Sequence, residues 1–217
     1  MARISSQGTI IMIGTDMAIS VEITAVTKAK PAVVTVDATD DIQVGTIIIP
    51  RGTGFKSIDD QAYQVSNVSA LAVTLSDSDT TKETLSGPNA GATAIVPEMQ
   101  EMCRSTFTVN GPAGATIDVT TLCDEAHRIV SGLPAIGTWT ANGFYDYQDV
   151  TLKKAREYYR SGEIVPIEAI FRDKSSISFM GTINTYDITL GINAAVTTNV
   201  GGNVDGPVHL NDPAVVI

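Results

Sequence analysis

The sequence predicts a mainly β fold, a β-sandwich or barrel with two short helices, into which a second small β-barrel domain is inserted. Three observations predict it. Short apolar runs alternate with Gly, Asn, Asp, Ser and Pro along most of the 217 residues, a spacing typical of sandwiches and barrels. A small, flexible stretch at 86–92 separates a dense group of strands from the rest. Two segments in the second half carry helix start and stop signals.

The dense group of strands follows the first 20 residues. Five runs with strand character are separated by turn residues such as Lys30-Pro31 and Asp59-Asp60, and they span 21–27, 32–38, 45–50, 62–68 and 71–76. Five strands in about 65 residues are enough for a compact barrel. We therefore expect an inserted barrel domain at 21–86 and a core domain made of 1–20 and 87–217.

Both helices are expected in the core domain. In the first, Thr121 and Asp124 fit a capping pattern, and Gly132 supplies the stop. The second begins at Asp149 as N-cap and ends at Gly162. Its apolar stripe is expected to consist of Leu152, Ala155 and Tyr159.

After the second helix the apolar pattern changes to a period of two. Three successive strand faces are expected, and their apolar residues are 165, 167, 169 and 171, then 177, 179 and 183, then 186, 188, 190 and 192. The change of parity predicts a bulge near Asn184-Thr185. The remaining tail from Thr197 is rich in Gly and Asn, so we expect an arm and not a core strand.

The letters Asp124-Glu125-Ala126-His127 spell a helicase motor box, but the context does not fit that chemistry. Such a box needs a buried strand before the Asp and a GxxxxGK[ST] phosphate loop elsewhere, and the sequence has neither. Two acids at a helix start are explained by the helix dipole. The two histidines have no Glu or Cys at metal-ligand spacing, and no GxSxG elbow is present. We expect no catalytic, metal or cofactor site.

The charge of the chain excludes a nucleic-acid-binding surface. The chain has 14 basic and 24 acidic residues, which gives a formal net charge of −10, and no cluster of Lys and Arg occurs. Binding to phosphates normally needs a basic face. No segment approaches the length of a membrane span, so no membrane association is expected.

Residues 106–133 and the segments that follow them carry a family resemblance. The strand and turn Thr106–Gly114, the helix start Asp118-Val119-Thr120-Thr121 and the later Gly132-Leu133 resemble major tail tube proteins of long-tailed bacteriophages. The strand from Thr138 to Asp146 and the helix and hairpin after it fit the same pattern. The resemblance covers 99–200 well and 1–20 weakly.

The resemblance implies a structural virion protein that is not an enzyme. Its subunits would form stacked, hexameric rings that enclose the path of ejected DNA, which passes through without being bound. It implies tape-measure, tail-terminator and baseplate proteins as partners, the virion tail as location, and assembly in the cytoplasm of the bacterial host. Inter-subunit contacts are expected from both chain ends, through Arg3, Ile4, Thr197, Asn199, Val200 and His209.

Residues 21–86 depart from the tail tube pattern and resemble a small barrel module of phage virion proteins. This module is similar in shape to the first catalytic-cysteine half-domain of ubiquitin-activating enzymes, without their activity. Asp40-Asp41 stand where the module usually has His-Gly. The resemblance implies a decoration on the outside of the tube.

The sequence leaves two other functions open. A capsid-decoration or adhesion module would also be all-β, acidic and without a catalytic site, but it would not stack into rings. A carbohydrate-binding sandwich would need exposed aromatic side chains, whereas the single Trp, Trp139, lies on a strand where burial is expected.

Overall fold

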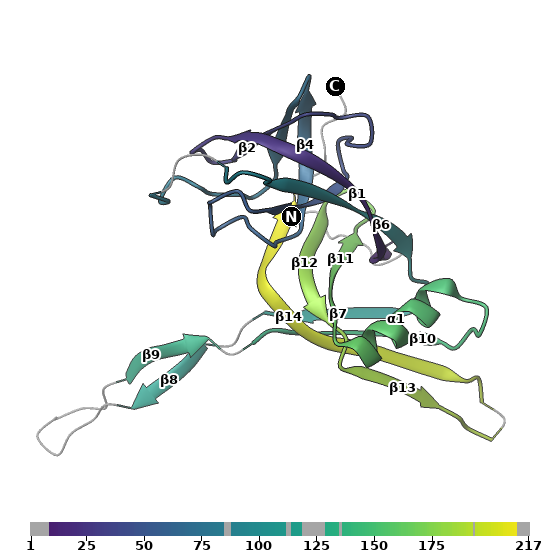
Figure 1. Cartoon of the computed structure of the whole chain (residues 1–217). Helices are drawn as coiled ribbons and strands as arrows, with labels where there is room; N and C mark the ends of the chain where they lie inside the picture. Colours follow the sequence, from purple (N-terminus) through teal and green to yellow (C-terminus); the bar gives the residue numbers. More distant parts are fainter. Residues whose placement is uncertain are drawn as a thin grey trace, which may run out of the picture.

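The computed structural model describes residues 9–84, 88–111, 114–118, 129–134, 136–192 and 194–211. Within them the chain forms fourteen strands and one helix. The mainly β fold with an additional small barrel is thereby confirmed. Figure 1 shows three stacked parts: a barrel, a central sheet and a second sheet with the helix beside it.

The first part is the sheet with the helix beside it, and we call it the front sheet. It has four antiparallel strands in the order β7-β10-β14-β13. Its strands are β7 (Thr106–Asn110), β10 (Thr138–Phe144), β14 (Thr197–Asn211) and β13 (Thr185–Thr189). Only the first half of β14 belongs to it, since 197–203 pair with β10. The front sheet is built from short Thr- and Asn-rich strands, whose apolar residues alternate with polar ones.

The second part, called the middle sheet, runs β6-β1-β11-β12-β14. It uses part of β1 (Ile10–Val26) and of β6 (Thr93–Glu101), together with β11 (Ile164–Ile170), β12 (Ser176–Thr182) and the second half of β14. The strand β14 therefore passes from one sheet into the other. Its partner changes at Val204, which pairs with Gly181 of β12.

The third part is a closed barrel of six strands. The ends of β1 and β6 that lie away from the middle sheet join β2 (Val33–Val36), β3 (Ile47–Arg51), β4 (Tyr63–Ser69) and β5 (Ala72–Leu75). The order β2-β5-β4-β3-β6-β1 closes because β1 also pairs with β2. Five of these strands match the runs expected from the sequence. The sixth, β6, follows the stretch at 86–92, so the barrel closes with a strand from beyond that stretch.

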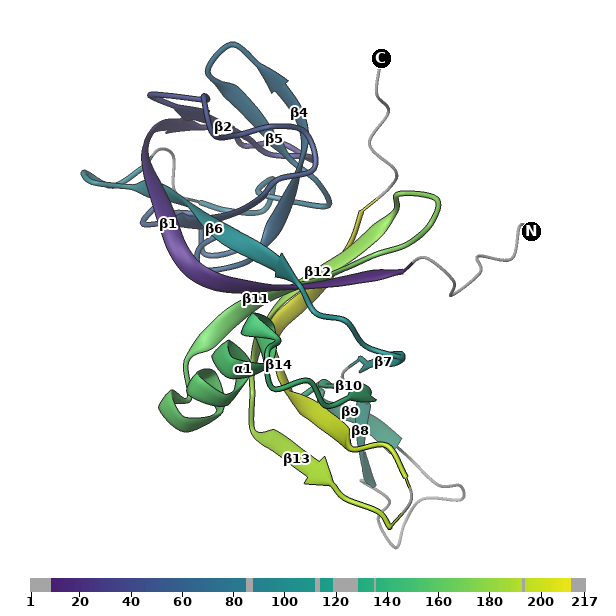
Figure 2. The same ribbon diagram turned by 90° about the vertical axis from the view of Figure 1, so that its right-hand side faces the viewer.

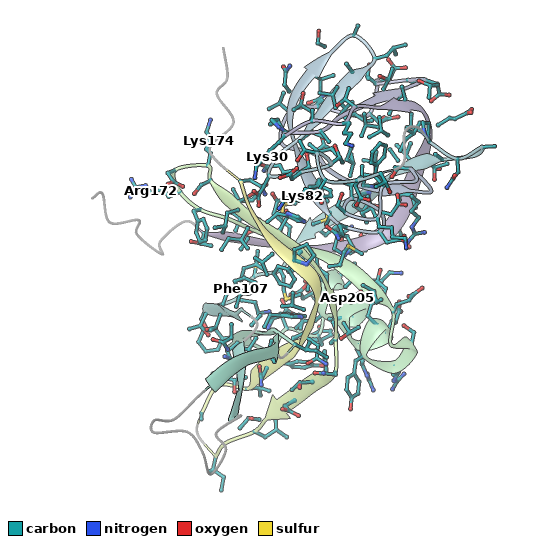
Figure 3. The ribbon with its side chains drawn as sticks, turned by 90° about the vertical axis from the view of Figure 1, so that its left-hand side faces the viewer. Lys30, Lys82, Phe107, Arg172, Lys174 and Asp205 are labelled. Carbon is teal, nitrogen blue, oxygen red and sulfur yellow. The ribbon has the colours of Figure 1, made fainter. Side chains whose placement is uncertain are left out.

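The main core lies between the front and middle sheets. Its buried side chains include Trp139 of β10, Phe179 of β12 and Ile167 of β11, and Figure 3 labels Phe107 of β7, which packs against this cluster. The indole Nε1 of Trp139 donates to the carbonyl oxygen of Thr182 at 3.2 Å. This bond satisfies the polar end of the buried ring, as burial of Trp requires.

Helix α1 (Val150–Ser161) closes one side of the sandwich. Asp149 caps it by accepting from Thr151 N and Leu152 N, and Gly162 ends it with φ of 71°, as the sequence predicts. Its buried face consists of Thr151, Leu152, Ala155 and Tyr158. The expected Tyr159 is half-exposed, because the stripe follows a spacing of three residues and not four.

The other expected helix is wrong at its C-terminal end. Ile129–Pro134 is strand β9, which pairs with β8 (Gly114–Asp118), so Gly132 lies within a strand and does not stop a helix. Residues 119–128, with the cap residues Thr121 and Asp124, lie outside the described residues. The β-branched pair Ile129-Val130 favours a strand, and pairing with β8 outweighs the helical spacing of the sequence. Figure 1 shows β8 and β9 projecting away from the other sheets.

The tail from Thr197 is also different from the expectation of an arm. It is β14, the strand that both sheets share, and Val200 within it has no exposed surface. Its glycines lie at the crossing of the sheets, where a Cβ on Gly202 would collide with the carbonyl oxygen of Thr182. A composition poor in large apolar residues is thus required by close backbone packing.

We predict that Gly202→Ala destabilises the fold by about 3 kcal/mol, because the added methyl group forces two backbones apart. Denaturant unfolding followed by circular dichroism measures this. Gly111→Ala is the matched control, since a Cβ there meets nothing within 4 Å, and it should change stability by less than about 0.5 kcal/mol. Equal effects of the two changes would contradict the role of close packing at the crossing.

Candidate assembly surfaces

The face of the front sheet that points away from the core is almost uncharged and, apart from the exposed Phe144 at the end of β10, polar. Residues opposite each other in antiparallel strands share a face, so the pairs Thr106–Asn142, Asn142–Asn199 and Asn199–Asp187 form one row across all four strands. The parallel row contains Thr108, Thr140, Gly201 and Thr185. Every residue of these strands that belongs to the front sheet is described, and this face holds one acid, Asp187, and no Lys or Arg. We call it the outer face.

Both edges of the front sheet are open in the described part of the chain. β7 pairs there with β10 alone, and β13 pairs with β14 alone. Each edge presents unpaired backbone N–H and C=O groups, which are templates for another strand. The two edges differ in sequence and lie on opposite sides of the sheet, so a contact between them would join different surfaces of two copies.

An apolar strip continues β13 past the end of the core. Ile188 is half-exposed, while Leu190 and Ile192 are 76% and 97% exposed. The sequence predicts one strand face shared by these residues and Tyr186, but β13 ends at Thr189, before Leu190 and Ile192. Only Tyr186 packs against the core. The expected strand is thus wrong for Leu190 and Ile192, and β13 itself extends beyond the sandwich, as Figure 2 shows. Exposed apolar side chains in a row mark a contact surface.

The corner between β10 and α1 is fixed by a buried arginine that the sequence patterns did not single out. Arg104 Nη1 donates to Phe144 O at 3.4 Å, and Nη2 lies 3.5 Å from the cap carboxylate of Asp149. Burial lowers the pKa of Arg104, and the charge of Asp149 opposes that shift. The guanidinium therefore ties the end of the front sheet to the start of the helix. Sequence offers no signal for this role beyond an Arg after a strand.

The predicted inter-subunit residues fall into three groups. Arg3 and Ile4 lie outside the described residues. Thr197 and Asn199 are on the outer face, where contact with another subunit stays a prediction. Val200 and His209 are buried inside the chain, so their assignment to a free arm is wrong. They are core residues because β14 is a shared strand.

The residues of the helicase-like box, Asp124, Glu125 and His127, also lie outside the described residues. Among the residues that the structure describes, no group of three or more His, Cys, Asp or Glu side chains is placed to hold a metal ion. The described helix is too short and too polar to cross a membrane.

Comparison with solved structures gives partial similarities to virion proteins, two of which are described below. No protein-family profile matches the sequence, and a search for curated relatives found no match. A chain from the virion of the native gene transfer agent particle is 15% identical, with a TM-score of 0.45 over 52% of this chain and 89% of that chain. The SPP1 tail tube, solved by solid-state NMR and electron cryo-microscopy, is 14% identical, with a TM-score of 0.40 over 52% of this chain and 68% of that chain.

Proposed function

We propose that this protein is the major subunit of a phage tail tube, a structural virion protein whose rings stack into a conduit for DNA. The front sheet carries the proposal, because it combines two open edges with an outer face that lacks basic residues. The family resemblance of 99–200 points to the same role and supplies the expected number of six subunits in a ring.

Ring formation follows from the two edges. If β7 of one copy lies beside β13 of the next, the front sheets join into one continuous sheet, and every subunit makes the same two contacts. Such a head-to-tail contact closes into a ring when the rotation per subunit divides a full turn. Pairing would satisfy the open backbone groups of both edges. The apolar strip of Ile188, Leu190 and Ile192 lies next to the β13 edge and would be covered by the neighbour.

The outer face would line the lumen. Its Thr and Asn side chains hydrate well, and its one charged group, Asp187, repels phosphate. Because affinity for DNA comes mainly from Lys and Arg at phosphates, DNA would move past this face without being held.

The barrel would then lie on the outside of the tube. The middle sheet packs against the front sheet with one face and against the barrel with the other. A front sheet that faces the lumen therefore places the barrel at the largest radius. In this proposal the barrel is the decoration domain expected at 21–86, and it also takes in the start of β6 from the expected core of 1–20 and 87–217. Its kinship to the half-domain of ubiquitin-activating enzymes and the partners in the tail stay predictions.

A decoration or adhesion module remains the alternative, and it differs from a tube subunit in assembly. The function of such a module would not require the two open strand edges of the front sheet. A carbohydrate site centred on Trp139 is not available, because that ring is 1% exposed.

Assembly is tested by electron microscopy of the concentrated pure protein. Rings or hollow tubes are expected. Leu190→Ser with Ile192→Ser should leave the melting temperature of the monomer unchanged, because both side chains are exposed, but should raise the concentration needed for assembly at least about tenfold, through loss of apolar burial of at least about 1.4 kcal/mol. The matched control is Leu71→Ser, an exposed leucine on the barrel. Monomers at every concentration, or equal effects of the two sets of changes, would contradict the proposal.

The lumen is tested by adding charge to the outer face. Thr108→Lys with Asn142→Lys should leave the monomer stable, because both side chains are exposed, and should make assembled tubes retain short DNA at low salt. Retention should fall steeply as salt rises, as counterion release requires. The control Thr108→Glu with Asn142→Glu should not retain DNA. Retention of DNA by the wild-type tube would contradict the proposal that DNA passes the outer face without being bound.

The place of the barrel is tested by removing it at the β1–β6 ladder. Glu22 and Thr93 are directly opposite partners, so Asn-Gly in place of residues 23–92 should close a two-residue hairpin. We expect a folded protein that still forms rings, with a smaller outer diameter. Met180→Ser should accompany the deletion, because the barrel covers that side chain. A product that is insoluble with several turn sequences would mean that the barrel is part of the tube wall.

A further inference from the structure

The contact between the barrel and the middle sheet is small, buried and partly polar. Its apolar part consists of Ile47, Ile49, Ala62, Ile95 and Met180. Beside it, Gln64 of β4 donates its Nε2 to Glu168 Oε1 at 3.0 Å, and Ser178 donates its hydroxyl to Ala62 O at 3.2 Å. The rings of Tyr63 and His209 lie with centroids 4.2 Å apart. The barrel therefore rests on the middle sheet through a mixed surface, unlike the apolar core between the two sheets.

Glu168 is the one buried acid of this contact in the described chain. It is 2% exposed and lies between Met12 of β1 and Ser178 of β12. No ion pair to Glu168 occurs among the described residues. Burial raises its pKa to about 7, and hydrogen bonds from Ser176 and Gln64 oppose that shift only in part. A carboxylate without a cation in such a place costs much more free energy than the protonated acid, which keeps its hydrogen bond from Gln64.

Other titratable groups surround the same contact. His209 lies on the neighbouring strand in the row of Glu168 and Ser178, and its Nδ1 is 3.6 Å from Asp77 Oδ2 of the barrel. Burial lowers the pKa of His209, and Asp77 opposes this. Burial raises the pKa of the Tyr63 phenol, and the charge of Asp77 adds to that shift, so Tyr63 stays neutral. On the other side, Glu101 of β6 is exposed and lies two strands from Glu168.

The connection between barrel and sheet has the features of a hinge. Within the described residues, only β1 and β6 run from one part into the other. Their pairing shifts register between Gly14 and Asp16 and again between Asp16 and Ile19. Pro97 of β6 lies between the paired residues Val96 and Glu98 and has no N–H for the ladder. Bulges and a proline weaken and bend a ladder at such a point.

We propose that the barrel is latched to the middle sheet in a proton-dependent way: protonated Glu168 holds it docked, and ionisation of Glu168 favours its release about the β1–β6 hinge. Undocking exposes the carboxyl to water, where it ionises readily. On a tube, this latch would set how firmly the outer barrel is held.

The direction of the pH dependence follows from the two states of each group. Glu168 has the higher pKa when docked, so its contribution to docking is complete below about 4.5 and is lost as pH rises toward 7. His209 has the lower pKa when docked, so its contribution is present above about 6.5 and is lost as pH falls. The two groups oppose each other, and a variant of Glu168 alone separates them.

The experiment measures thiol labelling of Ala62→Cys in the full chain, with Cys103 and Cys123 replaced by Ser. Residue 62 is 1% exposed in the contact, so it is labelled only when the barrel undocks, at a rate proportional to the undocking equilibrium constant. Rates are normalised to an unstructured cysteine peptide at each pH. The ratio of the labelling rate with Glu168 to the rate with Glu168→Gln should rise about 70-fold from pH 5 to pH 8, given a pKa of about 7 when docked and 4.5 when undocked. Division by the rate of the Gln variant removes the contributions of His209 and all other titrating groups.

Controls separate undocking from unfolding. Ala141→Cys reports opening of the sandwich core and Ala94→Cys opening of the barrel core, and both should be labelled much more slowly than Ala62→Cys. Glu101 is a matched acid in the same row, and Glu101→Gln should leave the pH dependence of Ala62→Cys labelling unchanged. A ratio that stays constant with pH, or equal rates at all three cysteine positions, would overturn the latch.

Discussion

The architecture depends on one constraint, the sharing of strand β14 between two sheets. A strand that leaves one sheet for another must bend, and the sheets must come close where it crosses. At the crossing, a Cβ on Gly201 would stand 2.8 Å from Trp139 O, and one on Gly202 would collide with the backbone of Thr182. Two adjacent glycines therefore allow the backbones to touch. Trp139 then fills the space beside the crossing and bonds to Thr182 O, which fixes the distance between the sheets.

Once β14 is shared, each face of the middle sheet has a defined role. The alternation of strand side chains places Val165, Ile167 and Phe179 toward the front sheet, where they form an apolar core. The opposite parity places Glu168, Ser178 and His209 toward the barrel. A sheet covered on both faces normally has apolar residues on both. Here one face is apolar and one is mixed, so the barrel contact is the weaker of the two.

Local signals predicted the elements whose neighbours are close in the sequence. The five barrel strands, the cap at Asp149 and the stop at Gly162 follow from turn and capping chemistry, which involves only a few residues. The sequence could not show that β6, which begins 18 residues after β5 ends, closes the barrel, because closure depends on pairing with β1. It could not identify β14 either, since the glycines of a sheet crossing have the composition of a loop.

The open surfaces were the hardest to predict, for a related reason. Apolar residues at alternate positions predict burial, but they do not say what covers them. Tyr186 packs on the core, while Leu190 and Ile192 continue the same pattern into solvent. In an isolated chain this pattern is unexplained, but beside an open strand edge it is what a repeated contact between copies requires. The same logic covers the outer face: Thr and Asn fit a strand that stays hydrated on one side, and the absence of cations there fits a surface that acidic polymers pass without binding.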